Sequence, residues 1–468
     1  MSYGILNLAP YVPPMRLERG EIYGAVGWAV PSLKGLATGE RAVANWDEDA
    51  ITMGFEAARR CLSSNQQPPS RVTFASTTFP FADRSNSGII CSALNMPSSV
   101  RNEDVFGSRR AAVSALVRHF ETKADGLLVA SDCRDAKPGS AQEMSYGHAA
   151  AAVLLGQGRV KAEIIAASSI HDDLVDQYRS RGNRFDYALE ERWVREEGWL
   201  KTVPQAIDDV MKAATISTEN LDKVIVHGSS GASRSVAKKL GISPEKIANN
   251  LYSSVGDAGT AHPLLMLAEA VKHSKEADLI LVVGFGQGAD VVLLKRTKEK
   301  LTNDWDFELN RRVVKNYTQF LSLRDMIAID FGLRAERDNR TALSAFYRKN
   351  KEITGMLGGR CTKCNTLQFP KSLICVKCGA SHSQEFESLA NMVGRVKSFT
   401  EDWLAYTPSP PYIYGNVEFE GEANIMLEFA DFGPGQVKVG DNVRLVFRIK
   451  DFDDKRDFRR YFWKPAPS

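Results

Sequence analysis

The same order of apolar and polar segments occurs twice along the first 294 residues of the chain. Three segments of the first copy have counterparts in the second, and each pair is separated by about 152 residues. The matched segments are 72–75 with 224–226, 110–120 with 261–273, and 127–129 with 279–283. A constant offset over three elements indicates an internal duplication. The sequence therefore predicts two copies of a βαβαβ unit.

Continuous apolar strands alternate with helices in both copies, which predicts an α/β fold with a largely parallel sheet covered on both faces. A helix is expected over 47–62, with three acidic residues in its first turn, and another over 88–94. The copies give two predicted domains, 1–165 and 166–296. Residues 297–347 are charged and helix-prone, and we expect a helical connector there.

Four of the seven cysteines lie close together after this connector. They form two C-x-x-C pairs, Cys361 with Cys364 and Cys375 with Cys378. This spacing allows four thiolates to reach one tetrahedral Zn²⁺. Without metal, so small a segment would have too little core to fold. The pattern predicts a zinc ribbon over 348–390, whose closed Cys₄ site makes the metal structural.

Period-two alternation follows the ribbon and predicts short strands, which favour a small OB-type β-barrel over 391–468. The expected strands include 394–400, 415–419, 423–429 and 443–449. OB folds often bind nucleic acid, but that activity needs a positively charged groove. Residues 360–468 contain 15 basic and 14 acidic residues without a basic stripe. We therefore expect no nucleic-acid partner.

Composition and charge exclude several kinds of partner for this protein. The 468 residues carry a net charge of only +3, which gives no case for a polyanionic partner. The apolar runs are shorter than the ~20 residues that span a bilayer. The first residues lack the basic and apolar regions of a signal peptide. We expect a protein of the reducing cytoplasm with no membrane partner.

Residues 1–294 resemble the hydroxymethylglutaryl-CoA synthase and ketoacyl synthase III branch of the thiolase superfamily. The motifs that carry the resemblance are Ala130-Ser131-Asp132, 147–150, His227, 256–261 and 284–288. The resemblance implies a five-layer α/β/α/β/α fold of two thiolase-like halves, and at least a homodimer. The segment 360–468 resembles the rubredoxin-like zinc ribbon and OB-fold family that accompanies such enzymes.

The segment 104–116 is similar to the thiolase pattern Asp-x-x-x-x-Cys-x-x-x-x-x-Ala-Leu, with Asp104, Ala115 and Leu116 in place. The position of the nucleophilic cysteine is Arg109. An arginine cannot accept an acyl group, because it has no accessible neutral form. Its guanidinium could bind a carboxylate or an enolate oxygen of a substrate. Alternatively, it could form a buried ion pair that fills a catalytically inactive site.

The resemblance implies roles for two further residues. His227 matches the catalytic histidine, and Asp257 stands at the asparagine position, where a carboxylate could act as a base or orient His227. His262 lies at the place in the second copy that corresponds to the Arg109 turn, so it could face the same cavity. Each has a structural alternative: His227 as a core histidine, Asp257 as a turn residue that caps a helix, and His262 as a capping or packing residue. The predicted substrate-binding residues are Ser108, Gly228, Phe285 and Gly286.

The leading hypothesis is an enzyme that makes or breaks a C–C bond next to a CoA thioester. Without the cysteine, an aldol or retro-aldol step is favoured over acyl transfer, with His227, Asp257, His262 and Arg109 as catalytic residues. The alternative is a non-catalytic scaffold that pairs with an active thiolase. Acyl-CoA is the expected small-molecule partner, and Zn²⁺ the expected metal.

Overall fold

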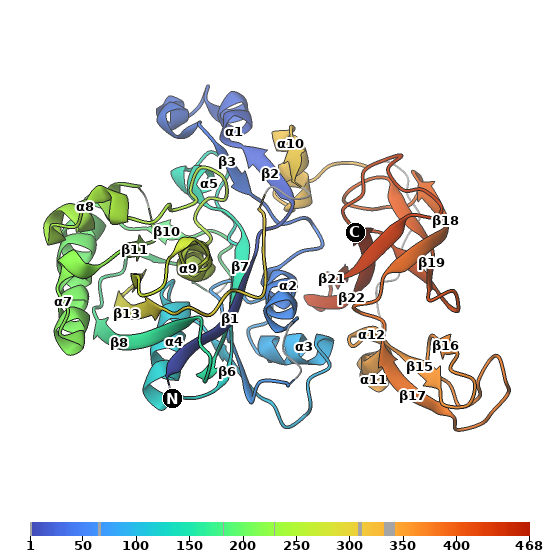
Figure 1. Ribbon diagram of the computed structural model, residues 1–468. Coiled ribbons are helices and arrows are strands. Elements are labelled where there is room, and N and C mark those ends of the chain that lie inside the picture. Colours follow the sequence, from blue (N-terminus) through green and yellow to red (C-terminus); the bar gives the residue numbers. More distant parts are fainter. Residues whose placement is uncertain (1, 64–66, 181, 229, 308–310, 332–341) are drawn as a thin grey trace. The chain divides into compact units, whose positions relative to one another are not determined.

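The computed structural model describes residues 2–63, 67–180, 182–228, 230–307, 311–331 and 342–468 (Figure 1). The chain forms two compact units. Unit 1 comprises Met1–Ala44, Asp49–Gly88 and Pro97–Phe320, and unit 2 comprises Asn45–Glu48, Ile89–Met96 and Leu321–Ser468. No helix in the described ranges is long and apolar enough to cross a membrane.

Unit 1 is built on nine hydrogen-bonded strands in the order β11-β12-β13-β8-β1-β7-β6-β4-β5. The interiors of most of these strands are apolar and buried, which is the pattern of strands covered on both faces. The edge strand β5 is an exception, because its residues, apart from Val105, are polar and none of them is buried. Their bounds are β1 (Tyr3–Tyr11), β4 (Arg71–Ala75), β5 (Arg101–Val105), β6 (Gly126–Asp132), β7 (Ala149–Gln157), β8 (Ala162–His171), β11 (Lys223–Val226), β12 (Leu279–Phe285) and β13 (Gly288–Arg296).

The strand order confirms the predicted duplication. The first half runs β5-β4-β6-β7-β1, and the second repeats the order as β11-β12-β13-β8. Where β5 pairs with β4 in the first half, the second has a single parallel bridge from Val224 to Ile247. The halves join where Gly4 of β1 faces Glu163 of β8. The second half thus begins with β8, before the boundary predicted at residue 166.

The prediction of a largely parallel sheet is wrong. Only the pairs β4·β5, β4·β6 and β11·β12 are parallel, and the other ladders of this sheet are antiparallel. β13 follows β12 through a tight turn at Gly286 and Gln287, so the chain reverses without a crossover helix. The error arose because an antiparallel strand buried on both faces has the same continuous apolar sequence as a parallel one.

The helices of unit 1 complete the predicted five-layer α/β/α/β/α fold (Figure 1). Helices α4 (Ala111–Thr122) and α9 (His262–His273) form the middle layer. They share one apolar core with strands of both halves, through residues such as Leu116 and Leu264. The outer helices are α2 (Ala50–Leu62) for the first half, and α7 (Val203–Ala214) and α8 (Ser230–Leu240) for the second. Most of the residues of α3 (Asn86–Ala93) belong to unit 2.

The helix predicted over 47–62 begins later, at Ala50. Asp49 lies before the helix as its N-cap, and its carboxylate accepts hydrogen bonds from the amides of Ile51 and Thr52, both at 3.0 Å. The acidic residues expected in the first turn therefore precede the helix. Asp is favoured at the N-cap and Asp and Glu in the first turn, because a carboxylate at either place lies near unpaired N–H groups.

The segment expected to be a helical connector is more varied. It contains the strand β14 (Arg312–Val314), which pairs with β2 (Met15–Glu18) beside β3 (Glu40–Ala42), and the helix α10 (Tyr317–Leu323). Other described helices outside the core are α1 (Arg19–Val26), α5 (Ala141–Ser145), α6 (Glu191–Trp193), α11 (Leu343–Arg348) and α12 (Asn350–Ile353). Residues 308–310 and 332–341 of the connector lie outside the described part of the chain.

Unit 2 contains a small three-stranded sheet and a larger five-stranded one. The small sheet comprises β15 (Leu357–Cys361), β16 (Leu367–Gln368) and β17 (Gln384–Ser388). The larger sheet is antiparallel, in the order β20-β19-β18-β21-β22. Its strands are β18 (Gly394–Asp402), β19 (Tyr412–Phe419), β20 (Ala423–Glu428), β21 (Asn442–Asp453) and β22 (Phe458–Pro467).

The two edges of the larger sheet approach each other. The Ala430 amide, just after β20, donates a hydrogen bond of 2.9 Å to the carbonyl of Pro465 in β22. Lys464 of β22 and Glu428 of β20 form a buried ion pair at 3.1 Å. The predicted strands are confirmed, and the approach of the edges favours a barrel. Its OB type stays a prediction.

Candidate functional site

The four predicted zinc ligands form one cluster in the ribbon. The sulfur atoms of Cys361, Cys364, Cys375 and Cys378 all lie within 4.8 Å of one another, with Cys361 to Cys378 at 3.8 Å and Cys364 to Cys375 at 3.5 Å. Four thiolates about 2.3 Å from a tetrahedral Zn²⁺ are separated by about 3.8 Å, so the cluster fits this metal. Four protein ligands leave no open position, and the zinc is structural.

Polar groups around the cluster stabilise sulfur as thiolate. The amide of Lys363 donates to the sulfur of Cys361 at 3.4 Å, and the hydroxyl of Ser383 lies 3.3 Å from the same sulfur. The Thr366 hydroxyl is 3.3 Å from the sulfur of Cys364. Such contacts orient the ligands and balance their charge.

In unit 1, the predicted site gathers around the start of α4. Gly107, with φ of 102°, turns the chain out of β5, and Ser108 then donates a hydrogen bond of 2.6 Å to the carbonyl of Gly286. A Cβ on Gly286 would lie 2.7 Å from the Ser108 hydroxyl, so only glycine fits this approach. Ser108 and Gly286, both predicted to bind substrate, hold the β12–β13 turn against the helix start.

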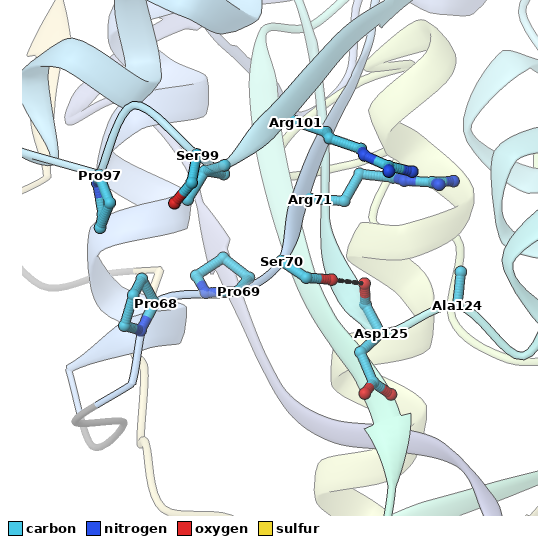
Figure 2. Close-up of a pocket in the computed structure, with 10 residues that line it drawn as sticks. Pro68, Pro69, Ser70, Arg71, Pro97, Ser99, Arg101, Ala124 and Asp125 are labelled. Carbon is cyan, nitrogen blue, oxygen red and sulfur yellow. Dashed lines mark hydrogen bonds between the residues drawn. The ribbon is translucent and has the colours of Figure 1, made fainter.

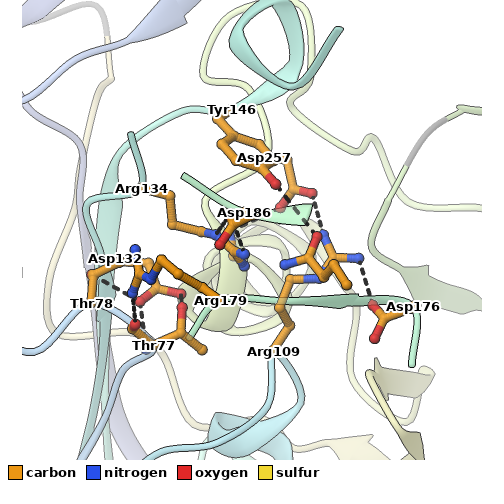
Figure 3. Close-up of polar contacts among 12 residues, drawn as sticks. Thr77, Thr78, Arg109, Asp132, Arg134, Tyr146, Asp176, Arg179, Asp186 and Asp257 are labelled. Atoms are coloured by element: carbon orange, nitrogen blue, oxygen red, sulfur yellow. Dashed lines mark hydrogen bonds and ion pairs between the residues drawn. The ribbon is translucent and has the colours of Figure 1, made fainter. Parts of the chain in front are cut away.

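Arg109 is largely buried, and its guanidinium faces Asp257 and Asp176 (Figure 3). Its guanidinium pairs with Asp257 at 2.9 Å and with Asp176 at 3.3 Å. The three side chains are only 13%, 11% and 2% exposed, in that order. The Nε atom is buried and has no hydrogen-bond partner among the described residues. One N–H of this guanidinium thus remains available for a further acceptor.

Asp257 is held as a carboxylate. Burial alone would raise the pKa of this carboxyl, but the charge of Arg109 and a 2.9 Å hydrogen bond from the Gly259 amide hold the pKa far below its ordinary value. A group that stays ionised cannot donate a hydrogen bond to a substrate oxygen. The geometry gives Asp257 the role of counter-ion to Arg109.

His227 follows the carboxyl end of β11 and is completely buried. Its Nδ1 atom lies 3.3 Å from the carbonyl of Val283, which identifies Nδ1 as the protonated nitrogen of the neutral ring. Nε2 is buried and has no hydrogen-bond partner among the described residues. Burial, together with the positive charge of Arg109, lowers the pKa of the imidazole to about 4. At neutral pH, Nε2 is therefore a free lone pair inside the protein.

His262 lies close to His227, with ring centroids 6.5 Å apart. Its two nitrogens are both engaged: Nδ1 accepts from the Ala258 amide at 3.1 Å, and Nε2 lies 2.8 Å from the carbonyl of Asn250. This geometry favours the packing and capping alternative for His262 over proton transfer.

Gly228 and Phe285 pack against Trp199 of the π-helix η2 (Val194–Thr202). The Phe285 ring is fully buried with its centroid 4.4 Å from that of Trp199, so this side chain belongs to the core. Gly228 has a φ of 120°, and a Cβ there would lie 3.3 Å from the Trp199 ring. These two predicted substrate-binding residues shape the wall behind His227.

The sequence did not single out a second buried arginine nearby. Arg134, in the loop after β6, pairs with Asp186 through Nε at 3.1 Å and through a terminal nitrogen at 2.6 Å (Figure 3). The Tyr146 ring lies over its guanidinium at 5.1 Å. The partners of the two arginines lie on one hairpin: Asp176 directly precedes β9 (Gln177–Tyr178), and Asp186 directly precedes β10 (Tyr187–Ala188). This polar segment shows no periodicity that would have indicated such a role.

Asp132 ends β6 in the quoted Ala-Ser-Asp motif and organises the neighbouring turns. Its buried carboxylate accepts hydrogen bonds from Ser76, Thr77, Thr78 and the Thr260 amide at 2.7–3.1 Å. Thr77 and Thr78 lie in the turn that follows β4. Here they serve as donors to Asp132.

A surface depression of about 450 Å³ lies elsewhere in unit 1, at the beginnings of β4 and β5 (Figure 2). Arg71 and Arg101 are register partners on these parallel strands, and both line it. His227 instead follows the carboxyl end of β11, where parallel strands place their sites. The depression is thus separate from the candidate site.

Two family descriptions match parts of the chain. Residues 211–293 match the C-terminal domain of 3-oxoacyl-[acyl-carrier-protein] synthase III, and residues 357–383 match the rubredoxin-like zinc ribbon domain of ChsH2. Hydroxymethylglutaryl-CoA synthase of Aeropyrum pernix is 28% identical over 345 residues, which cover 70% of this chain and 96% of that protein. The predicted resemblance is confirmed.

Solved structures agree with the thiolase-like fold of unit 1. The crystal structure of a hydroxymethylglutaryl-CoA synthase complexed with CoA has a TM-score of 0.60 at 15% identity, covering 83% of this chain and all of that one. The 3-oxoacyl-(acyl carrier protein) synthase III of Pseudomonas aeruginosa has a TM-score of 0.57 at 18% identity, covering 65% of this chain and 100% of that one. At these identities the likeness concerns the fold.

Proposed function

We propose that the thiolase-like unit binds an acyl-CoA and moves a proton at the carbon next to the thioester, in an aldol or retro-aldol reaction. The observation that carries this proposal is the buried Nε2 of His227, a neutral nitrogen with no partner among the described residues. Buried polar atoms are nearly always hydrogen-bonded, so one left open beside a charged cluster marks a place for a ligand. The similarity to synthases that act on CoA thioesters supports the choice of acyl-CoA.

The chemistry needs a base and a donor for the enolate oxygen. In the retro-aldol direction, His227 takes the proton of the β-hydroxyl, and the Cα–Cβ bond breaks as Cβ becomes the carbonyl carbon of a released aldehyde or ketone. The electron pair of the broken bond forms the enolate of the shortened acyl-CoA, and His227 then returns the proton to Cα. The open Nε–H of Arg109 supplies a hydrogen-bond donor for that oxygen. The developing negative charge offsets the charge of Arg109 and raises the pKa of His227 as the proton arrives.

We place Arg109 at the nucleophile position of the family, so no covalent acyl-enzyme is part of this mechanism. Asp257 keeps Arg109 oriented, and His262 supports the fold. CoA thioesters are thus substrates of a site that acts without an acyl-cysteine.

The test is exchange of the α-protons of acetyl-CoA in D₂O, followed by mass spectrometry, because exchange reports proton abstraction without requiring the natural acyl group. His227→Asn should slow exchange by roughly 10²-fold or more. His119→Asn is the matched control, since His119 is also buried but both ring nitrogens have partners, at 3.0 Å and 3.1 Å. Exchange that survives in the His227 variant would remove the proposed role.

A second candidate is the scaffold, favoured by one observation. The carboxylates of Asp257 and Asp176 already form ion pairs with Arg109, as expected for an inactive site that is filled by a buried ion pair. In this case the chain would pair with a separate, active thiolase, and the homo-oligomer implied by the resemblance would be replaced or joined by a mixed complex. Exchange of acetyl-CoA α-protons by the purified chain alone would exclude it.

A further inference from the structure

The depression at the beginnings of β4 and β5 contains two arginines that stand side by side. Arg71 and Arg101 are register partners on these parallel strands, and their side chains extend in the same direction (Figure 2). Neighbouring strands lie about 4.8 Å apart, and like charges directly opposite each other destabilise the pairing. An anion bound between two such guanidinium groups removes this repulsion.

The described part of the chain supplies no anion to this pair of arginines. Neither guanidinium group forms an ion pair or a hydrogen bond with a described residue. Glu103 lies on the same face of β5 as Arg101, but it pairs with Arg118 at 2.7 Å. Asp125 lines the depression, but its carboxylate points away from both arginines (Figure 2). The positive charge of the pair is therefore open to a ligand.

Hydrogen bonds and prolines give the depression a fixed shape. The amide of Arg101 donates to the carbonyl of Ser70 at 3.1 Å, and the Ser70 hydroxyl donates to the carbonyl of Asp125 at 2.8 Å. These bonds join the three segments that line the depression. The apolar part of the lining includes Pro68, Pro69, Pro97 and Val100. Because proline fixes its own φ angle, this wall needs little ordering when a ligand binds.

We propose that the depression is a second binding site, for an organic phosphate whose phosphoryl group lies between Arg71 and Arg101 and whose ring packs on the prolines. A phosphate monoester carries close to two negative charges at pH 7, which match the two guanidinium groups, whereas a carboxylate carries one. Arginine also presents a planar fork that binds phosphate oxygens through two nitrogens. The volume of about 450 Å³ lies in the range of small-molecule sites, so the depression holds more than a phosphoryl group. A nucleoside monophosphate has both parts.

This inference goes beyond the proposed function and does not depend on it. The depression lies at the amino ends of its strands and shares no residue with the site around His227. The two proposals can therefore fail separately.

The test is isothermal titration of the full chain with adenosine 5′-monophosphate at low ionic strength, where contacts with arginine are least screened. Adenosine lacks the phosphoryl group, and glycerol 3-phosphate lacks the ring. We expect the monophosphate to bind at least tenfold more tightly than either compound, and acetyl-CoA not to displace it. Hydrogen–deuterium exchange should slow in peptides that span 68–71 and 97–101.

Arg71→Met and Arg101→Met should each weaken binding of the monophosphate at least tenfold. Arg159→Met is the matched control, because it removes one positive charge from unit 1 at a side chain that is 89% exposed and pairs with Glu299 at 3.5 Å. It should change the affinity by less than twofold. Without ligand, neither test variant should lower the melting temperature of unit 1, since each removes one of two repelling charges. Loss of binding is thus separated from loss of the fold.

Absence of binding to the native chain would overturn the inference, as would equal affinity for the monophosphate and glycerol 3-phosphate. Binding that persists in both arginine variants, or that acetyl-CoA displaces, belongs to another site and overturns it too. Test variants that melt at a lower temperature would contradict the repulsion on which the inference rests. Exchange of acetyl-CoA α-protons should stay unchanged in Arg101→Met, so the proposed function survives each of these results.

Discussion

Replacing Arg109 by methionine tests whether this side chain is a buried counter-ion. Methionine keeps most of the volume and removes the charge, which leaves Asp257 and Asp176 without their cation. The two carboxylates lie 2.9 Å and 3.3 Å from the guanidinium, and both are nearly buried. Removing one partner from such a pair costs about 3–5 kcal/mol, because an uncompensated charge stays buried. We expect a loss of this size in the free energy of unfolding of unit 1 at pH 7.

The loss should depend on pH. In the native chain the folded pKa of Asp257 is depressed, so this group stabilises the fold above the pKa of the unfolded carboxyl and loses that contribution as the pH falls. Without Arg109, burial dominates and the folded pKa rises above the unfolded one. The variant is then less stable at high pH, and the difference from the native chain narrows between pH 7 and pH 5.

Hydrogen–deuterium exchange of peptides from α4 and β12 measures the opening of unit 1 separately from unit 2. A loss of 3–5 kcal/mol corresponds to exchange roughly 10²- to 5 × 10³-fold faster. Arg118→Met is the control, since Arg118 lies on the same helix and pairs with Glu103 at 2.7 Å but is 42% exposed. Such a surface pair contributes about 0–1 kcal/mol. A loss below about 1 kcal/mol in Arg109→Met, or one that is equal at pH 5 and pH 7, would refute the reasoning.

Three other predictions concern separate parts of the chain. Removal of zinc with a chelator, or Cys361→Ser, should unfold the ribbon and leave unit 1 intact, as measured by hydrogen exchange over 357–388; protection of the ribbon without metal would contradict this. Asp49→Ala should destabilise unit 1 by about 1 kcal/mol, because two N–H groups at the start of α2 lose their acceptor; an unchanged melting temperature of unit 1 would count against it. The pKa of His227 is about 4 in the folded chain, against an ordinary 6.5. The unfolded chain therefore takes up this proton at a higher pH than the folded chain does, and the free energy of unfolding should fall by up to about 3 kcal/mol as the pH drops from 6.5 to 4. His227→Asn should flatten that slope, and an NMR titration that places the imidazole pKa above 6 would exclude this account.

The duplication could be predicted because it depends on local patterns. Apolar runs such as 72–75 and 224–226 recur at a fixed offset, and each becomes a strand at the same place in its half. Strand direction could not be predicted in the same way. The interiors of β7 and β13 are as apolar as those of β6 and β12, so the pattern indicates that a strand is buried but not whether it runs parallel or antiparallel to its neighbour.

Some residues of the candidate site could be predicted from local sequence patterns, and others could not. Positions near motifs, such as His227 and Asp257, could be found because each follows a strand or turn with a recognisable sequence. The partners of the buried arginines could not, because Asp176 and Asp186 lie in a polar hairpin 67 and 52 residues along the chain from Arg109 and Arg134. An ion pair between distant segments leaves no trace in local periodicity. The sequence therefore predicted where the site lies, but not which carboxylates balance the charges of its arginines.

That balance explains how an arginine is tolerated at the start of α4. The positive end of a helix favours an anion, and a lone guanidinium there would be repelled. Arg109 with Asp257 and Asp176 carries a net charge of −1, so the helix start still faces negative charge.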